Sequence, residues 1–109
     1  MNFDVMRRTL EPEKTQHIWN VMYFYQRLWL AVKYKNIHRK YVPEMFGENF
    51  YWWYIKCYQD QLVKPEEKGE LSWQAARHIE ELWVWLEDNA GPGDKERWRN
   101  RAEEMADPV

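Results

Sequence analysis

The chain has 109 residues, of which 45% are hydrophobic and 31% are charged, and this composition favours one folded domain over a disordered chain. Its net charge of −2, with histidines neutral, excludes a strong overall field that would attract nucleic acid or an anionic membrane. Its one cysteine excludes an intramolecular disulfide, and no signal peptide or run of about 20 apolar residues is found, so we expect a cytoplasmic protein with no membrane partner.

The first long helix is predicted from about Pro12 to Asn36, after an N-terminal arm at 1–10 in which Phe3–Val5 suits a short extended segment. Pro12 fits the first turn of a helix, where its missing N–H group costs nothing. Apolar residues at three-four spacing predict the face of this helix that packs in the core: Ile18, Val21, Met22, Tyr25, Leu28, Trp29 and Val32. A second, mixed face lies beside this core face and contains Trp19, Tyr23, Gln26, Leu30 and Lys33.

A short helical turn is predicted next, over Pro43–Phe46, with Gly47 closing it in the left-handed conformation that glycine adopts without strain. The following helix should cover about Glu48 to Leu62. Its core stripe consists of Phe50, Trp53, Tyr54, Cys57, Tyr58 and Leu62.

Two further helices complete the predicted fold. One covers about Leu71 to Asn89 and is ended by Gly91 and Pro92. Its core stripe consists of Trp73, Ala76, Ile79, Leu82, Trp83 and Leu86. The other, about Asp94 to Ala106 with Asp94 as N-cap, has the short stripe Trp98, Ala102 and Met105, so we expect a loosely docked element over 94–109. The sequence therefore predicts an all-α chain, a compact bundle of about four to five helices in one domain over 1–109.

Five consecutive aromatic residues, Phe50–Tyr54, are the unusual feature of a chain that is 17% aromatic. Successive helical side chains diverge by about 100°, so these rings point in all directions around the axis. Either this helix is central and surrounded, or Tyr51, Trp52 and Ile55 face outward. We favour the outward arrangement, with Trp19 and Tyr23 extending an aromatic surface that binds a protein partner. This hypothesis describes a non-enzymatic interaction module, an inhibitor or adaptor; self-association through the same helix is the alternative.

The segment Lys33–Tyr41 suggests a second function, because its cations are interleaved with tyrosines and include no acid. Lys33, Lys35, Arg39 and Lys40 could meet phosphates while Tyr34 and Tyr41 stack on bases, as in proteins that bind single strands. A solvated positive cluster at a helix C-terminus is the commoner explanation of such a pattern. Acidic residues near the fourth helix, among them Glu80, Glu81 and Asp88, are most simply a solvated face but would also suit a basic partner.

No pattern of catalytic or metal-binding residues is found. His17, His38 and His78 have no spacing that indicates a metal site, and Cys57 falls on a predicted core stripe. The remaining enzymatic alternative uses His17 or His78 with a nearby glutamate, without a nucleophile or phosphate loop beside it. We therefore expect no enzyme, no cofactor and no metal.

A resemblance to a known family rests on Tyr34–Asn36, on Val42–Gly47, on Tyr54 and on Leu82–Leu86. These segments are similar to a domain-of-unknown-function family of small helical proteins in bacteria and their phages. The resemblance covers about Ile18 to Leu86, and the sequence lacks the glycine that often follows the first helix in that family. It implies an α-helical architecture and no established activity.

Overall fold

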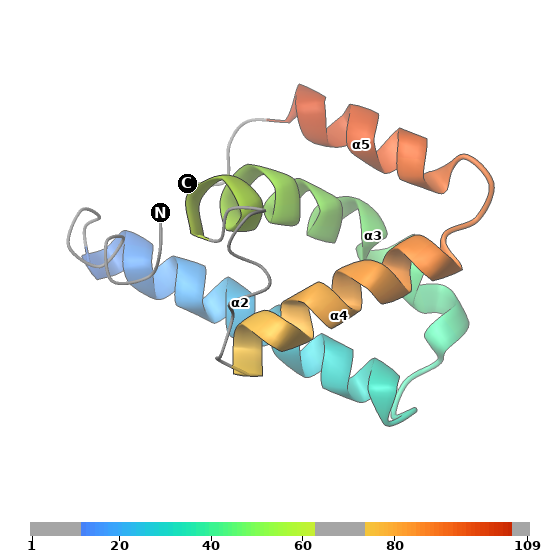
Figure 1. The fold of residues 1–109 in the computed structure, drawn as a ribbon, viewed down its shortest axis with the longest axis horizontal. Coiled ribbons are helices and arrows are strands. Elements are labelled where there is room, and N and C mark those ends of the chain that lie inside the picture. Colours follow the sequence, from blue (N-terminus) through green and yellow to red (C-terminus); the bar gives the residue numbers. More distant parts are fainter. Residues whose placement is uncertain (1–11, 63–73, 106–109) are drawn as a thin grey trace.

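The computed structural model describes residues 12–62 and 74–105, and the side chains at 16–59 and 74–105. The predicted arm at 1–10, with Phe3–Val5, and the expected helix start at Leu71–Trp73 lie outside the described residues. The described part is all-α, as predicted (Figure 1). Its elements are α2 (Pro12–Lys33), the 3₁₀ turn η1 (Arg39–Tyr41), α3 (Val42–Trp53), the π-helical continuation η2 (Tyr54–Leu62), α4 (Gln74–Asn89) and α5 (Asp94–Glu104).

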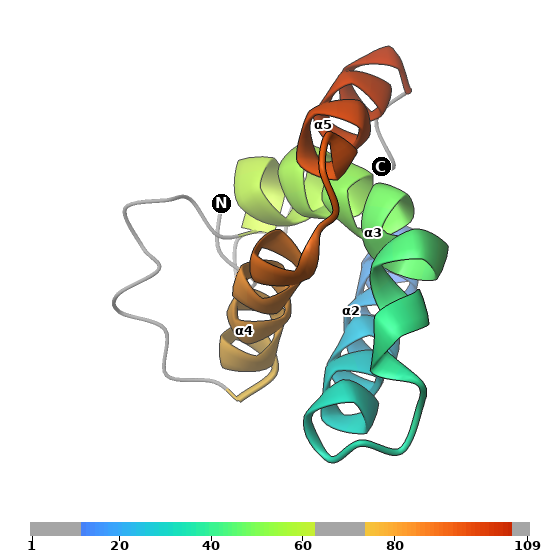
Figure 2. The same cartoon turned by 90° about the vertical axis from the view of Figure 1, so that its right-hand side faces the viewer.

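The helix α3 is central in this arrangement. Helices α2 and α4 pack against each other and cross obliquely, α3 lies across one side of this pair, and α5 covers the opposite side of α3 (Figures 1 and 2). Tyr25 of α2 contacts α3, with its ring centroid 4.8 Å from that of Phe50 and 5.1 Å from that of Trp53. Because neighbours lie on both sides of α3, this helix can bury a much wider arc of apolar side chains than a surface helix can.

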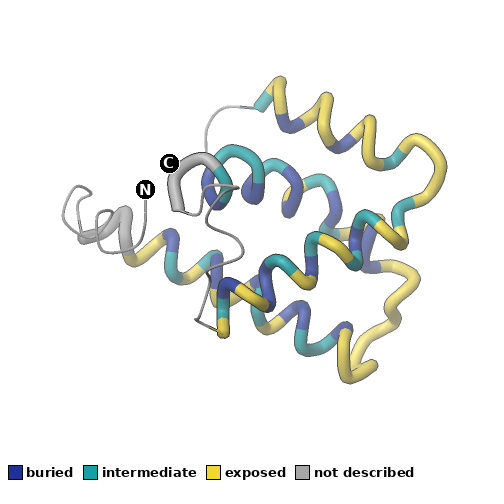
Figure 3. Tube along the Cα trace, in the orientation of Figure 1, coloured by how far each residue is buried: buried dark blue, intermediate teal, exposed yellow. Residues whose placement is uncertain are grey.

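The core stripes predicted from helical spacing are confirmed over the described residues. Figure 3 shows buried positions recurring along the sides of the helices that face one another. Where the side chain at a predicted position is described, only Val21, Trp83 and Met105 are half-buried rather than buried, and the predicted core residues Leu62 and Trp73 lie outside the described side chains. The buried members are Ile18, Met22, Tyr25, Leu28, Trp29, Val32, Phe50, Trp53, Tyr54, Cys57, Tyr58, Ala76, Ile79, Leu82, Leu86, Trp98 and Ala102.

The prediction of a separate turn at Pro43–Phe46 is wrong, because one helix runs from Val42 through Gly47 to Trp53. Pro43 lies in the first turn of α3, and Gly47 keeps a helical backbone instead of the expected left-handed one. The glycine is needed for space. A Cβ atom at Gly47 would lie 2.6 Å from Cε2 and from Cη2 of the Trp98 ring, well inside van der Waals contact.

The final helix packs more firmly than its short apolar stripe predicted. Trp98 is 2% exposed, and its ring lies against Gly47 and Tyr51 of α3, with the centroids of Trp98 and Tyr51 5.3 Å apart. The expected N-cap is also wrong: Gly93, at φ 78°, precedes α5, and Asp94 is its first residue. The Asp94 carboxylate instead accepts a 2.7 Å hydrogen bond from the Gly91 backbone N–H and closes the turn before α5.

Candidate functional site

Tyr51 does not face outward, so this part of the predicted docking surface is wrong. Its side chain is 0% exposed, stacked 4.3 Å from Trp83 and covered by Trp98. Tyr51 is buried because α5 packs over a side of α3 for which the sequence pattern predicted no neighbouring helix. The Tyr51 hydroxyl is buried beside the charged side chains of Glu87 and Arg99, and its pKa is raised first by this burial and then by the charge of Glu87.

Trp52 differs from its four aromatic neighbours because it is half-buried while Phe50, Tyr51, Trp53 and Tyr54 are buried. It lines a groove of about 530 Å³ between α2 and α3, which we call the α2–α3 groove. Rings and one aliphatic side chain form most of its wall: Val21, Phe24, Tyr25, Trp52 and Trp53. Polar groups are supplied by His17, Asn20 and Asn49. The groove therefore combines an apolar wall with a few hydrogen-bonding groups, as ligand and peptide sites do.

Exposed apolar side chains extend the α2–α3 groove along its rim. Phe24 is 44% exposed, and its ring centroid lies 6.1 Å from that of Phe46 on α3. Met45 is 65% exposed and precedes Asn49 and Trp52 at four-residue and seven-residue spacing, which places all three on one stripe of α3. Sequence analysis missed Phe24 and Met45, because an exposed apolar residue and a core residue look alike in a periodic pattern.

The other predicted docking residues do not join Trp52 in one surface. Trp19 and Tyr23 stack with ring centroids 5.4 Å apart on the flank of α2 nearer α4. Gln26 lies one turn after Tyr23 on the same side of α2, and its Nε2 is hydrogen-bonded to His78 Nδ1 of α4 at 3.0 Å. This hydrogen bond shows that this side of α2 is the one nearer α4. Ile55 is half-buried and packed against the core. The five predicted residues therefore do not form one surface. Tyr51 is buried and Trp52 lines the groove, whereas Trp19 and Tyr23 lie on the α4 side of α2 and Ile55 packs against the core.

The basic segment is exposed as a whole: the side chains of Lys33, Lys35, Arg39 and Lys40 all reach solvent. Two cations lie over tyrosines of their own segment, Lys33 over the Tyr34 ring at 5.8 Å and Lys40 over the Tyr41 ring at 5.2 Å. Arg39 instead reaches another element, with its guanidinium carbon 5.7 Å from the centre of the Trp85 ring of α4. No sequence pattern predicted this contact.

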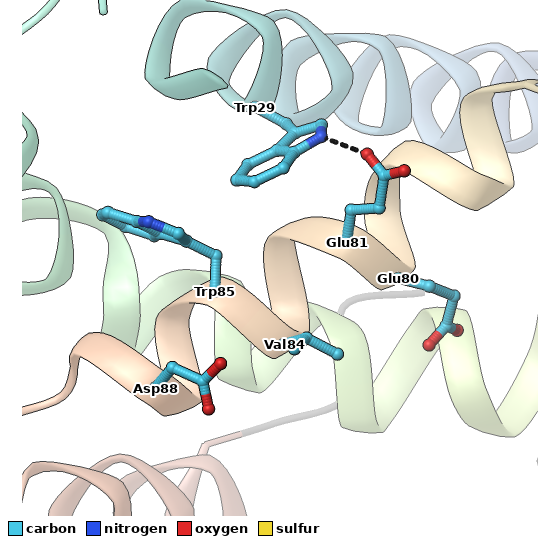
Figure 4. Close-up of a pocket in the computed structure, with 6 residues that line it drawn as sticks. All are labelled: Trp29, Glu80, Glu81, Val84, Trp85 and Asp88. Atoms are coloured by element: carbon cyan, nitrogen blue, oxygen red, sulfur yellow. Dashed lines mark hydrogen bonds between the residues drawn. The ribbon is translucent and has the colours of Figure 1, made fainter.

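A second hollow, of about 440 Å³, lies between α2 and α4 and is acidic (Figure 4). Its lining residues are Trp29, Glu80, Glu81, Val84, Trp85 and Asp88, and we call it the acidic hollow. Trp29 Nε1 donates a 2.6 Å hydrogen bond to Glu81 Oε2, which fixes that carboxylate at the rim. The buried Tyr54 hydroxyl donates to Glu80 Oε2 at 2.9 Å. The acidic face noted in the sequence thus borders a hollow with two tryptophan walls.

The groups considered for catalysis are dispersed in the structure. His78 is buried and bonded to Gln26, whereas His17 lies exposed at the rim of the α2–α3 groove. Burial raises the pKa of the Cys57 thiol to about 12, so this thiol stays protonated near neutral pH. Among the side chains described at 16–59 and 74–105, no three of histidine, cysteine or acidic residues converge as a metal site would require. None of the helices in this part of the chain has both the length and the apolarity needed to cross a bilayer.

In comparisons with known proteins, no family model, curated protein or solved structure matches this chain. The resemblance to a family of small helical bacterial and phage proteins therefore stays a prediction.

Proposed function

We propose that this chain is a non-enzymatic protein-interaction domain, an inhibitor or adaptor, that receives an amphipathic helix of a partner protein in the α2–α3 groove. The observation that carries the proposal is the position of Trp52. It is the one ring of the five-residue aromatic run that the neighbouring helices leave half-buried, and it lines the groove together with the exposed Phe24.

The shape and chemistry of the groove support a helical occupant. A groove between two helices accepts the apolar face of a third, whose side chains at three-four spacing enter the hollow. Large rings such as Trp52 contribute much of the binding energy at such surfaces, because they bury a large area and lose few rotamers. Met45 extends the wall with a flexible side chain that adapts to different partners. His17 and Asn49 supply hydrogen bonds that orient the bound helix.

The test compares two groove variants, Trp52→Ala and Phe24→Ala, with the control Tyr34→Ala, which removes an exposed ring outside the groove. The wild-type chain, the control and both groove variants are used to capture proteins from the native host. A protein that the wild type and the control capture, and that both groove variants lose, is purified. Calorimetry then measures its affinity for each version of the chain. We expect each groove variant to bind at least about thirtyfold more weakly, as at a hot spot. Circular dichroism and thermal unfolding establish that each variant is folded. Equal affinity of folded groove variants and wild type would exclude the groove.

A second candidate, binding of single-stranded nucleic acid, is favoured by the exposure of all four cations beside the exposed rings of Tyr34 and Tyr41. Labelled oligonucleotides titrated at two salt concentrations test it. Binding should weaken steeply with salt and be lost in the double variant Arg39→Glu/Lys40→Glu. Absence of binding at low salt, or an affinity unchanged by the charge reversals, would end this candidate.

A further inference from the structure

Two hollows of opposite charge share one tryptophan as a common wall. The acidic hollow is walled on one side by Trp85, and a neighbouring hollow of about 430 Å³ uses the same residue. This second hollow is lined by Arg39, Lys40, Pro43, Trp85 and Asn89, and we call it the basic hollow. The Arg39 guanidinium over the Trp85 ring marks the boundary between them. An acidic half and a basic half of one surface therefore abut at a single ring.

The charged groups of both halves are available to a partner. Neither the cations Arg39 and Lys40 nor the carboxylates of Glu81 and Asp88 form an ion pair with another described residue, and all four residues are exposed. Among the described residues, the Glu81 carboxylate accepts a hydrogen bond from Trp29 Nε1 through Oε2 alone. The described part of the chain thus presents complementary charges that it does not pair within itself.

Apolar surface lies between and beside these charges. Val84 is 55% exposed within the acidic hollow, Trp85 is half-buried at the boundary, and Tyr41 is exposed at the end of η1. Apolar side chains bordered by charged ones are the usual composition of a binding interface.

We propose that a second copy of this chain docks on this surface, about a two-fold axis that passes beside Trp85. The basic hollow of each copy then faces the acidic hollow of the other, so that Arg39 of one copy pairs with Asp88 of the other, twice. A two-fold interface uses the same patch on both subunits and requires it to be self-complementary, as this patch is. A nucleic acid would use only the basic half and be repelled by the acidic half, and a basic peptide would use only the acidic half. A second copy necessarily carries both halves at matching separation.

This interface is independent of the proposed partner site. The acidic hollow involves Trp29, whereas the α2–α3 groove involves Val21 and Phe24 on the other flank of α2. The dimer therefore leaves both grooves open, and each copy can receive a partner helix. Loss of dimerisation and loss of partner binding are distinguishable, because different variants produce them.

Sedimentation equilibrium of the purified chain, over a range of concentrations and at low and high salt, tests the proposal. The wild type should dimerise, more weakly at high salt because exposed charges are screened. Asp88→Lys and Arg39→Glu, each alone, should raise the dissociation constant of the dimer at least about tenfold, because each creates two like-charge contacts across the two-fold axis. A tenfold change corresponds to about 1.4 kcal/mol, shared between the two symmetric contacts. The double variant should return to within about threefold of wild type, since it exchanges the two charges.

The controls are Glu103→Lys and Arg27→Glu, which make the same changes in net charge at exposed positions outside both hollows. They should leave dimerisation unchanged. Circular dichroism shows whether each variant is folded. A wild type that sediments as a monomer at every concentration would overturn the proposal. So would a folded double variant that dimerises no more tightly than the single variants. Control variants that weaken the dimer as much as Asp88→Lys and Arg39→Glu would also overturn it.

Discussion

Replacing Gly47 with alanine adds one methyl group at the contact between α3 and α5. In an exposed helix this change stabilises by about 1 kcal/mol, because alanine has the higher helix propensity. Here the new Cβ atom would lie 2.6 Å from Cε2 and Cη2 of Trp98, about 1 Å inside normal carbon–carbon contact. Trp98 is enclosed and cannot rotate away, so we take overpacking at its upper range, about 3 kcal/mol. The net expectation is a destabilisation of about 2 kcal/mol.

The same methyl group should become favourable once the ring is removed. In a Trp98→Ala background the steric conflict is absent, and Gly47→Ala should stabilise the chain by about 1 kcal/mol through propensity alone. Trp98→Ala itself should cost about 3–5 kcal/mol, the usual cost of removing a buried large ring. The two substitutions therefore have a coupling energy of about 3 kcal/mol, large enough to measure in a double-mutant cycle.

Urea unfolding followed by far-ultraviolet circular dichroism measures these free energies, with an unchanged m-value as the sign of an intact transition. Asn49→Ala, at an exposed position of the same helix, is the control and should stabilise by a few tenths of a kcal/mol. If Gly47→Ala stabilised the wild-type chain as it does the Trp98→Ala variant, the Trp98 ring would not lie against Gly47 and the docking of α5 would be wrong.

Two further predictions concern titratable groups in the core. Burial raises the pKa of Tyr25 from 10.0 to about 12, so the unfolded chain loses this proton first as pH rises. Stability from Tyr25 is therefore complete below pH 10 and is lost as the pH rises through 12. Between pH 10 and 12 the free energy of unfolding in urea should fall by about 2 kcal/mol more for wild type than for Tyr25→Phe, and parallel curves would contradict the assignment. The Cys57 thiol, buried with its pKa raised to about 12, should resist iodoacetamide at neutral pH in the native chain and react on unfolding in urea, as mass spectrometry can follow. Rapid labelling of the native protein would show that the thiol is accessible.

The all-α architecture and most of the core follow from the sequence because they depend on local periodicity. Apolar residues at three-four spacing, such as Ile18 with Met22 and Ile79 with Leu82, must share one side of a helix, and burying that side is the only way to remove it from water. Among the candidate site residues, the sequence pointed to Trp52 and to the exposed basic segment, since Trp52 lies in a run of aromatic residues and the segment is rich in cations and has no acid.

Which rings remain accessible was decided by tertiary structure. Periodicity gives the direction of Tyr51 around its own helix, but only the position of α5, held by Trp98 against Gly47, determines that this direction is covered. The same holds for both charged hollows: Arg39 and Trp85 are far apart in sequence, and no local pattern specifies that one lies over the other. Local sequence fixes the directions of side chains on each helix, whereas the packing of helices against one another determines which directions stay open to a partner.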